Sequence, residues 1–170
     1  LVALADDVDE LLRPVGRIME ERSGTRDLAG RYERQLGVER LGLAKTLGHV
    51  AVKGIALLAS DPFFRDGTDL TVLFHLRSKA TLMAALGTYE ARTRERRPDA
   101  KVQTVTLSGK PVRRLFTADG EVNQYRVELD DEVLALATSA AAIEALLAAQ
   151  AEPDRSLAEL GDFQYFRALY

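Results

Sequence analysis

The sequence contains no cysteine, which excludes disulfides, zinc ribbons and thiol catalysis. Histidine is nearly absent as well: there are two, and neither lies in a catalytic motif. No nucleophile elbow, phosphate-binding loop or dinucleotide fingerprint occurs in the 170 residues. The sequence therefore offers few positions at which catalysis or tight metal binding can be assigned.

Long apolar runs and an excess of either charge are also missing. No apolar stretch approaches the roughly 20 residues that a membrane-spanning helix needs. The formal net charge is −3, which gives no reason to expect a nucleic acid as partner. Arginines gather between residues 92 and 97, but glutamates are interleaved, and cations favour the C-terminal end of a helix.

The residues that are present have an ordinary globular balance. Hydrophobic residues make up 46% of the chain and charged residues 29%, enough for one domain with a core, or for two small ones. Residues 1–49 are expected to be mainly helical, starting with a capping box at Asp7 and Glu10. A later helix that carries Leu28 and Leu36 should end at Gly37, because glycine readily adopts the left-handed conformation that closes a helix.

The core of the fold is expected at residues 50–153, as a hairpin, a helix, a β-meander and a second helix. Apolar runs of strand length at residues 52–59 and 70–76 flank a loop rich in turn residues. Ser108-Gly109 and Asp119-Gly120 are typical of hairpin turns within the meander.

Two segments repeat the order of strand, serine and helix, with apolar residues at a constant offset. They are residues 73–78 and residues 134–139, each leading into a helix rich in Leu and Ala. A diverged repeat would produce this pattern, and so would any strand that runs into a serine-capped helix. Both interpretations predict that Ser78 and Ser139 are N-caps.

Residues 124–129 alternate strictly between polar and apolar side chains. The apolar set is Tyr125, Val127 and Leu129, and the polar set is Gln124, Arg126 and Glu128. The alternation predicts a strand whose apolar set faces helices and whose polar set faces water. The expected fold class is α+β: an antiparallel sheet of about five to seven strands, with helices packed on one face and a helical N-terminal segment.

An acidic loop holds the candidate metal ligands Asp61, Asp66 and Asp69. Hard cations such as Ca²⁺ take carboxylate oxygens, but the spacing does not follow the EF-hand pattern, and Arg65 lies among the carboxylates. We expect the alternative, a turn closed by aspartate side chains, and no bound metal. No position is assigned a catalytic or cofactor-binding role, and no cofactor is expected.

His75 lies in an apolar run, between Phe74 and Leu76. A general base there would need a carboxylate partner, which no nearby motif supplies. We therefore expect a structural histidine held by hydrogen bonds.

Residues 154–170 are expected to begin a further element that is truncated. Leu157, Leu160 and Phe163 have the spacing of a helix face, and Tyr165 and Phe166 add aromatic surface. The chain starts and stops within apolar segments, so both ends are expected to be cuts in a longer polypeptide. Self-association is one expected consequence of such an exposed apolar segment.

The order of elements between residues 50 and 169 resembles a group of uncharacterised bacterial proteins. The resemblance covers Gly67-Thr68-Asp69-Leu70 before a strand, the serine-capped helix and meander that follow, and residues 133–139 before a short helix. Proteins of this group carry a domain of unknown function and are often exported or lipid-anchored. The resemblance implies an extracytoplasmic, non-enzymatic role, and it carries over no catalytic residue.

The expected function is a non-catalytic structural or interaction module of a larger bacterial protein. Its partner would be the remainder of the same polypeptide or another protein. The alternative is a hydrolase or ligand-binding enzyme domain with a site of scattered Asp, Glu and Arg. Carboxylates that converge in a pocket with raised pKa values would favour the enzyme, and an apolar or absent pocket would favour the module.

Overall fold

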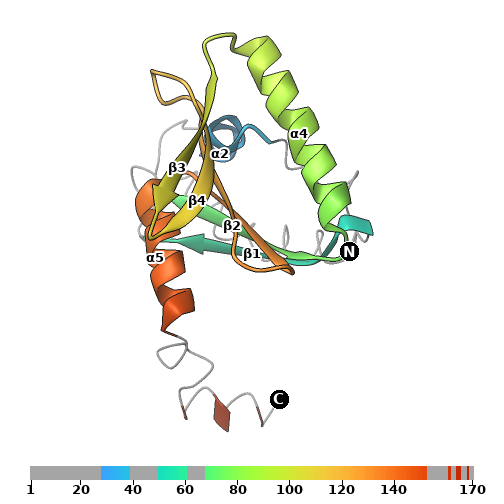
Figure 1. The fold of residues 1–170 in the computed structure, drawn as a ribbon, viewed down its shortest axis with the longest axis vertical. Helices are drawn as coiled ribbons and strands as arrows, with labels where there is room; N and C mark the ends of the chain where they lie inside the picture. The colour runs from blue at the N-terminus through green and yellow to red at the C-terminus, as the bar shows by residue number, and fades with distance from the viewer. Residues whose placement is uncertain are drawn as a thin grey trace.

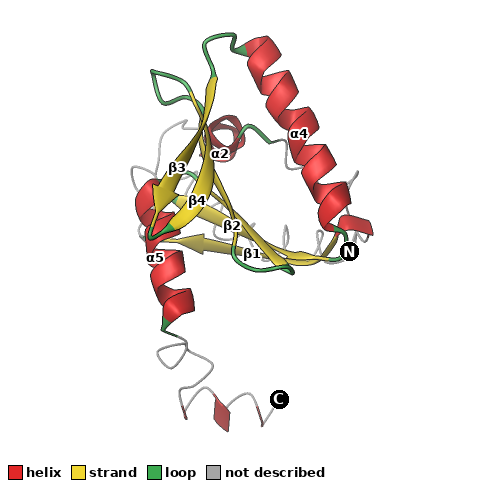
Figure 2. Cartoon of the chain, in the orientation of Figure 1, coloured by secondary structure: helices red, strands yellow, loops and turns green. Residues whose placement is uncertain are grey.

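The computed structural model describes residues 28–38, 50–60 and 68–152, with positions 161, 164, 165 and 168 near the C-terminus. Within these residues a six-stranded antiparallel sheet carries three helices (Figures 1 and 2). The α+β class and the antiparallel sheet predicted from the sequence are confirmed. Most of the expected helical N-terminal segment lies outside the described residues.

The sheet has the strand order β1-β2-β6-β5-β4-β3. Its strands are β1 (Val52–Ala59), β2 (Leu70–Leu76), β3 (Lys101–Leu107), β4 (Lys110–Phe116), β5 (Asn123–Glu128) and β6 (Val133–Ala137). The helices are α2 (Leu28–Leu36), α4 (Lys79–Arg96) and α5 (Ala140–Ala151). After the β1–β2 hairpin, α4 carries the chain to the far edge, and the meander returns strand by strand until β6 pairs with β2. None of the described helices combines the length and the apolar character needed to cross a membrane.

α2 ends at a glycine in the left-handed conformation, as the sequence predicts. Gly37 has a φ of 60°, and its N–H donates to the Arg34 carbonyl at 3.1 Å. The Val38 N–H donates to the Glu33 carbonyl at 3.1 Å, which completes a Schellman motif. Helix propagation therefore stops at a glycine that accepts the left-handed conformation without a steric cost.

Ser78 and Ser139 cap α4 and α5, as predicted. The Ser78 hydroxyl oxygen accepts the Thr81 N–H at 3.3 Å, and the Ser139 hydroxyl oxygen accepts the Ala142 N–H at 3.1 Å. The strands that lead into these caps, β2 and β6, are antiparallel neighbours in the middle of the sheet. The two strand–serine–helix units therefore run in opposite directions.

The helices cover both faces of the sheet, where the sequence led us to expect them on one. α4 and the end of α2 pack on the face that carries Leu134 and Leu136. α5 packs on the other face, against Ala135 and Ala137. These four of the five residues of β6 are 0% exposed, and a strand that is apolar on both sides needs cover on both sides.

β5 has the predicted alternation on its apolar side. Tyr125 and Val127 are 7% and 3% exposed and pack in the cluster that α5 covers. Leu129, one residue beyond the strand, packs against the same cluster. The predicted inward direction of these three side chains is confirmed.

The polar side of β5 requires a correction, because it faces helices and not water. Gln124 is 5% exposed and donates its side-chain amide to the Leu36 carbonyl at the end of α2. The Arg126 side chain is 10% exposed and forms an ion pair with Glu90 of α4. Glu128 alone of the polar set is exposed. Alternation in the sequence showed which residues share a face, but not what covers that face.

Candidate functional site

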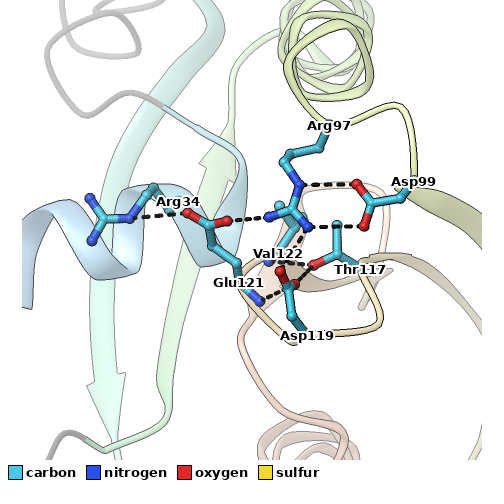
Figure 3. Close-up of polar contacts among 7 residues, drawn as sticks. All are labelled: Arg34, Arg97, Asp99, Thr117, Asp119, Glu121 and Val122. Atoms are coloured by element: carbon cyan, nitrogen blue, oxygen red, sulfur yellow. Dashed lines mark hydrogen bonds and ion pairs between the residues drawn. The ribbon is translucent and has the colours of Figure 1, made fainter.

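Charged side chains from distant parts of the chain meet at Arg97, which follows α4 (Figure 3). The Arg97 guanidinium donates to the two carboxylate oxygens of Asp99 at 3.0 and 2.9 Å, and to Asp119 at 2.8 Å. It also donates to Glu121, whose other carboxylate oxygen lies 3.7 Å from Arg34 of α2. The network ties α2 and the end of α4 to the turn between β4 and β5.

Asp119 organises that turn from within. Its Oδ1 accepts the Thr117 hydroxyl at 2.6 Å and the backbone N–H of Glu121 at 3.0 Å. The Thr117 oxygen in turn accepts the Val122 N–H at 3.1 Å. The bonds from Thr117, Glu121 and Arg97 hold the pKa of Asp119 well below its usual range. Asp119 is therefore a carboxylate at neutral pH.

A hollow of about 530 Å³ lies beside this network. Arg34, Thr93, Arg97 and Glu121 are among the residues that line it. A general acid would need a carboxyl group with a raised pKa, whereas hydrogen bonding to Arg97 lowers the pKa of the neighbouring Asp99. The ion pairs here join α2, the end of α4 and the β4–β5 turn, which is a structural role.

A second charged cluster lies under α4, where two arginines of the sheet share one carboxylate. Arg113 of β4 and Arg126 of β5 are directly opposite each other in the strand register. Glu90 of α4 accepts two bonds from Arg113, at 3.0 and 2.7 Å, and lies 4.0 Å from Arg126. The bonds from Arg113 lower the pKa of Glu90, while burial and the charge of Arg113 lower the pKa of Arg126. The three side chains together carry one net positive charge.

His75 lies at the sheet surface in a cluster with Lys53 and Glu132. Its Nε2 is 3.5 Å from the Lys53 Nζ and 3.6 Å from a carboxylate oxygen of Glu132. The Lys53 Nζ donates to the other Glu132 oxygen at 2.9 Å, which lowers the pKa of Glu132. The carboxylate that no local motif supplied comes from the residues between β5 and β6, 57 positions further along the chain (132 − 75). His49 lies outside the described residues.

Of the candidate metal ligands, Asp69 lies in the described part of the chain, and Asp61 and Asp66 lie outside it. Asp69 accepts the Ser60 N–H at 3.0 Å, the Thr68 hydroxyl at 3.3 Å and the Ser139 hydroxyl at 3.1 Å. Burial raises its pKa, but the bonds from Ser60, Ser139 and Thr68 outweigh burial and lower it. Asp69 thus closes the β1–β2 loop and joins it to the N-cap of α5. Over the described ranges, no group of histidines and carboxylates is arranged to hold a metal ion.

β1 forms one edge of the sheet and exposes apolar side chains on both of its faces. Ile55 and Leu57 are 51% and 54% exposed, and Leu58 is 45% exposed. The register sets Ile55 opposite Phe74, on the face of α4, and Leu58 opposite Thr71, on the face of α5. The other edge strand, β3, exposes polar side chains: Lys101, Gln103, Thr104 and Thr106.

Neither the arginine pair nor the β1 edge was singled out from the sequence. The signal for the arginine pair was present, since the strand register places Arg113 opposite Arg126 once the β4–β5 turn length is known. The run at residues 52–59 lacks alternation, which is typical of a buried strand and concealed its edge position. Tyr165, at 64% exposed, is the one member of the predicted C-terminal aromatic surface that the structure describes.

Comparison with known proteins gave no match to a family model, a curated protein or a solved structure. The candidate sites are therefore compared by their geometry. Two of them, the Arg97 network and Asp69, have carboxylates that are bonded to groups of the same fold. The β1 edge and the arginine pair differ. Within the described residues, one side of β1 has no partner strand, and Arg126 forms no short hydrogen bond to a carboxylate.

Proposed function

We propose that this chain is a non-catalytic structural or interaction module of a larger bacterial protein, and that it associates with a second copy of itself along β1. The observation that supports the proposal is the half-exposed apolar surface of this edge strand. Within the described residues, β1 pairs with β2 alone. An edge strand offers unpaired N–H and C=O groups, and flanking apolar side chains make it a template for another strand.

The residues of β1 suit antiparallel pairing with a second copy. With a two-fold axis at Ala56, Ile55 of one copy lies opposite Leu57 of the other, on the α4 face, and the reverse pair completes the contact. Lys53, the charged residue of the strand, then lies opposite Ala59 of the second copy. The pairing therefore joins apolar residues and places no like charges opposite each other.

The two edges of the sheet provide an internal comparison. Natural proteins protect edge strands with charged and polar side chains, and β3 has this composition. β1 has a bulge between Val52 and Gly54 and a charge at Lys53, but from Ile55 to Ala59 it has neither. The unprotected part of the edge is thus the part that the proposal assigns to pairing.

Sedimentation velocity over a range of concentrations tests the proposal with Leu57→Lys and with Thr104→Lys as the matched control. Both substitutions place one lysine at an exposed position of an edge strand. We expect the wild type and Thr104→Lys to dimerise, and Leu57→Lys to remain monomeric at the same concentrations. Equal thermal midpoints at monomeric concentrations would establish that both variants are folded.

Hydrogen exchange provides a second readout on the same samples. Those amides of residues 55–59 that point away from β2 should gain protection as the wild-type concentration rises, while those of β3 should not change. A wild type that stays monomeric up to millimolar concentration, or a Leu57→Lys variant that dimerises like the wild type, would contradict the role of β1.

A further inference from the structure

We propose that Arg113 and Arg126, beneath α4, form a binding site for an oxyanion of the carboxylate or phosphate type. The inference goes beyond association along β1 and does not depend on it. It starts from the sheet register, which places the two guanidinium groups on neighbouring strands, directly opposite each other. Like charges at such a position repel each other, so the pair needs a counter-charge.

The counter-charge within the fold is incomplete. Glu90 supplies one carboxylate, and both of its oxygens are bonded by Arg113, at 3.0 and 2.7 Å. Arg126 lies 4.0 Å from the nearer Glu90 oxygen, which is beyond hydrogen-bonding distance. Two guanidinium groups therefore share one carboxylate: Arg113 is hydrogen-bonded to it, and Arg126 interacts with it only as a longer ion pair.

Burial makes the position of Arg126 unusual. Its side chain is 10% exposed, and in the strand register it lies between Leu136, which is 0% exposed, and Arg113. A buried guanidinium normally has its hydrogen bonds satisfied by the surrounding chain. In the described part of the chain, the long ion pair with Glu90 is the one direct contact of the Arg126 guanidinium with a carboxylate. No buried side-chain nitrogen or oxygen of the described residues lacks a hydrogen-bond partner, so the unbonded N–H groups of Arg126 reach solvent, where an anion can meet them. Burial and Arg113 both lower its pKa, and the charge of a bound anion would favour the charged guanidinium and so oppose both effects.

The surroundings favour an anion over a cation or a neutral ligand. Arg113 is 42% exposed, so one side of the pair is open to solvent. Arg94, one helical turn beyond Glu90, adds a further positive charge close enough to influence the Glu90 carboxylate. The exposed Glu128 is paired with Lys79 at 2.5 Å, and its charge acts on Arg126 from a distance without a direct contact. Guanidinium groups bind carboxylates and phosphates through paired N–H donors, which defines the ligand class.

Thermal unfolding in inorganic phosphate, in acetate and in sodium chloride of matched ionic strength tests this site. We expect phosphate or acetate to raise the thermal midpoint with the logarithm of its concentration once the site is filled, on the order of 5–10 °C at about 100 times the dissociation constant, and chloride to give no such rise. A larger rise in phosphate than in acetate would assign the site to phosphate groups, and the reverse order to carboxylates. A wild type that responds equally to all three salts would overturn the proposal.

Two variants separate the site from general charge effects. Arg126→Met removes the buried guanidinium, and Arg114→Met removes a guanidinium from the opposite face of the same sheet. The rise in phosphate or acetate above that in chloride should be lost in Arg126→Met and retained in Arg114→Met, and its persistence in Arg126→Met would also overturn the proposal.

Side-chain NMR gives a readout that does not depend on unfolding. During a phosphate titration of the wild type, the Arg126 Nε–H signal, assigned by its absence in Arg126→Met, should shift saturably. A signal that does not move while the thermal midpoint rises would show that the anion binds elsewhere.

Discussion

At Asp119, one carboxylate holds a turn together through three donors: the Thr117 hydroxyl, the Glu121 N–H and the Arg97 guanidinium. Each bond is to the charged form of the side chain, so ionisation and folding are coupled there. The Arg97 network is thus a place where a single residue should make stability depend on pH.

We expect Asp119→Asn to destabilise the fold near neutral pH, since the amide carries no charge and presents N–H groups toward Arg97. The pKa of Asp119 is lowered from 3.8, so its stabilising contribution is present above that pH and is lost as the pH falls below it. The difference in unfolding free energy between the wild type and Asp119→Asn should therefore shrink between about pH 4 and about pH 2. Urea denaturation across this range measures it, with the exposed Glu144→Gln of α5 as control. A difference that stays constant with pH would contradict the coupling.

At the scale of elements, the N-cap serines of α4 and α5 make the same hydrogen bond to their own helices but differ in their tertiary contacts. The Ser78 oxygen accepts from Thr81 of its own helix. The Ser139 hydroxyl accepts from its own helix and also donates to Asp69, 70 residues earlier in the chain (139 − 69). One cap is local, and the other is also a tertiary contact.

We expect Ser78→Asp to leave the unfolding free energy within about 0.5 kcal/mol of the wild type, because aspartate caps helices as well as serine does. Ser139→Asp should cost about 1–2 kcal/mol, because its carboxylate would lie beside that of Asp69. Urea denaturation near neutral pH compares the two. Adding Asp69→Asn to Ser139→Asp should recover part of the loss. Equal stability of the two single variants would show that Asp69 is not close to the cap.

At the scale of the whole molecule, β6 connects the two packed faces of the sheet, because its side chains are buried alternately in the cluster on each face. Leu134 and Leu136 of β6 belong to the cluster under α4, while Ala135 and Ala137 belong to the cluster under α5. Leu36 of α2 lies in the first of these clusters, so residues from before the sheet pack in the same core. Loss of packing on one face should therefore weaken the other.

We expect Leu134→Ala and Ile143→Ala each to lower the unfolding free energy by about 2–5 kcal/mol, since both side chains are 0% exposed. Each variant should still unfold in a single transition, with the helix signal in circular dichroism and the tyrosine fluorescence changing together. Ile143→Ala is the critical variant, because it lies in α5. An early, separate loss of helix signal in that variant would show that α5 is an appended element and not part of a shared core.

The sequence by itself determined the local structure. Ser78, Ser139 and Gly37 were assigned to their caps, and the Ser108-Gly109 turn has the positive φ values, 47° and 79°, that such hairpins require. The strand intervals 52–59, 70–76 and 133–137 also follow from it. These signals act within a few residues, so a single sequence is enough to recognise them.

The tertiary structure alone decided what each face meets. It placed α5 opposite α4, turned the polar side of β5 toward helices and left β1 at an edge. It also brought Arg113, Arg126 and Glu90 together from two strands and a helix. Periodicity tells which side chains point the same way, whereas the element that covers them is selected by packing over the whole chain. The candidate sites depend on that packing, and so they could not be predicted from local pattern.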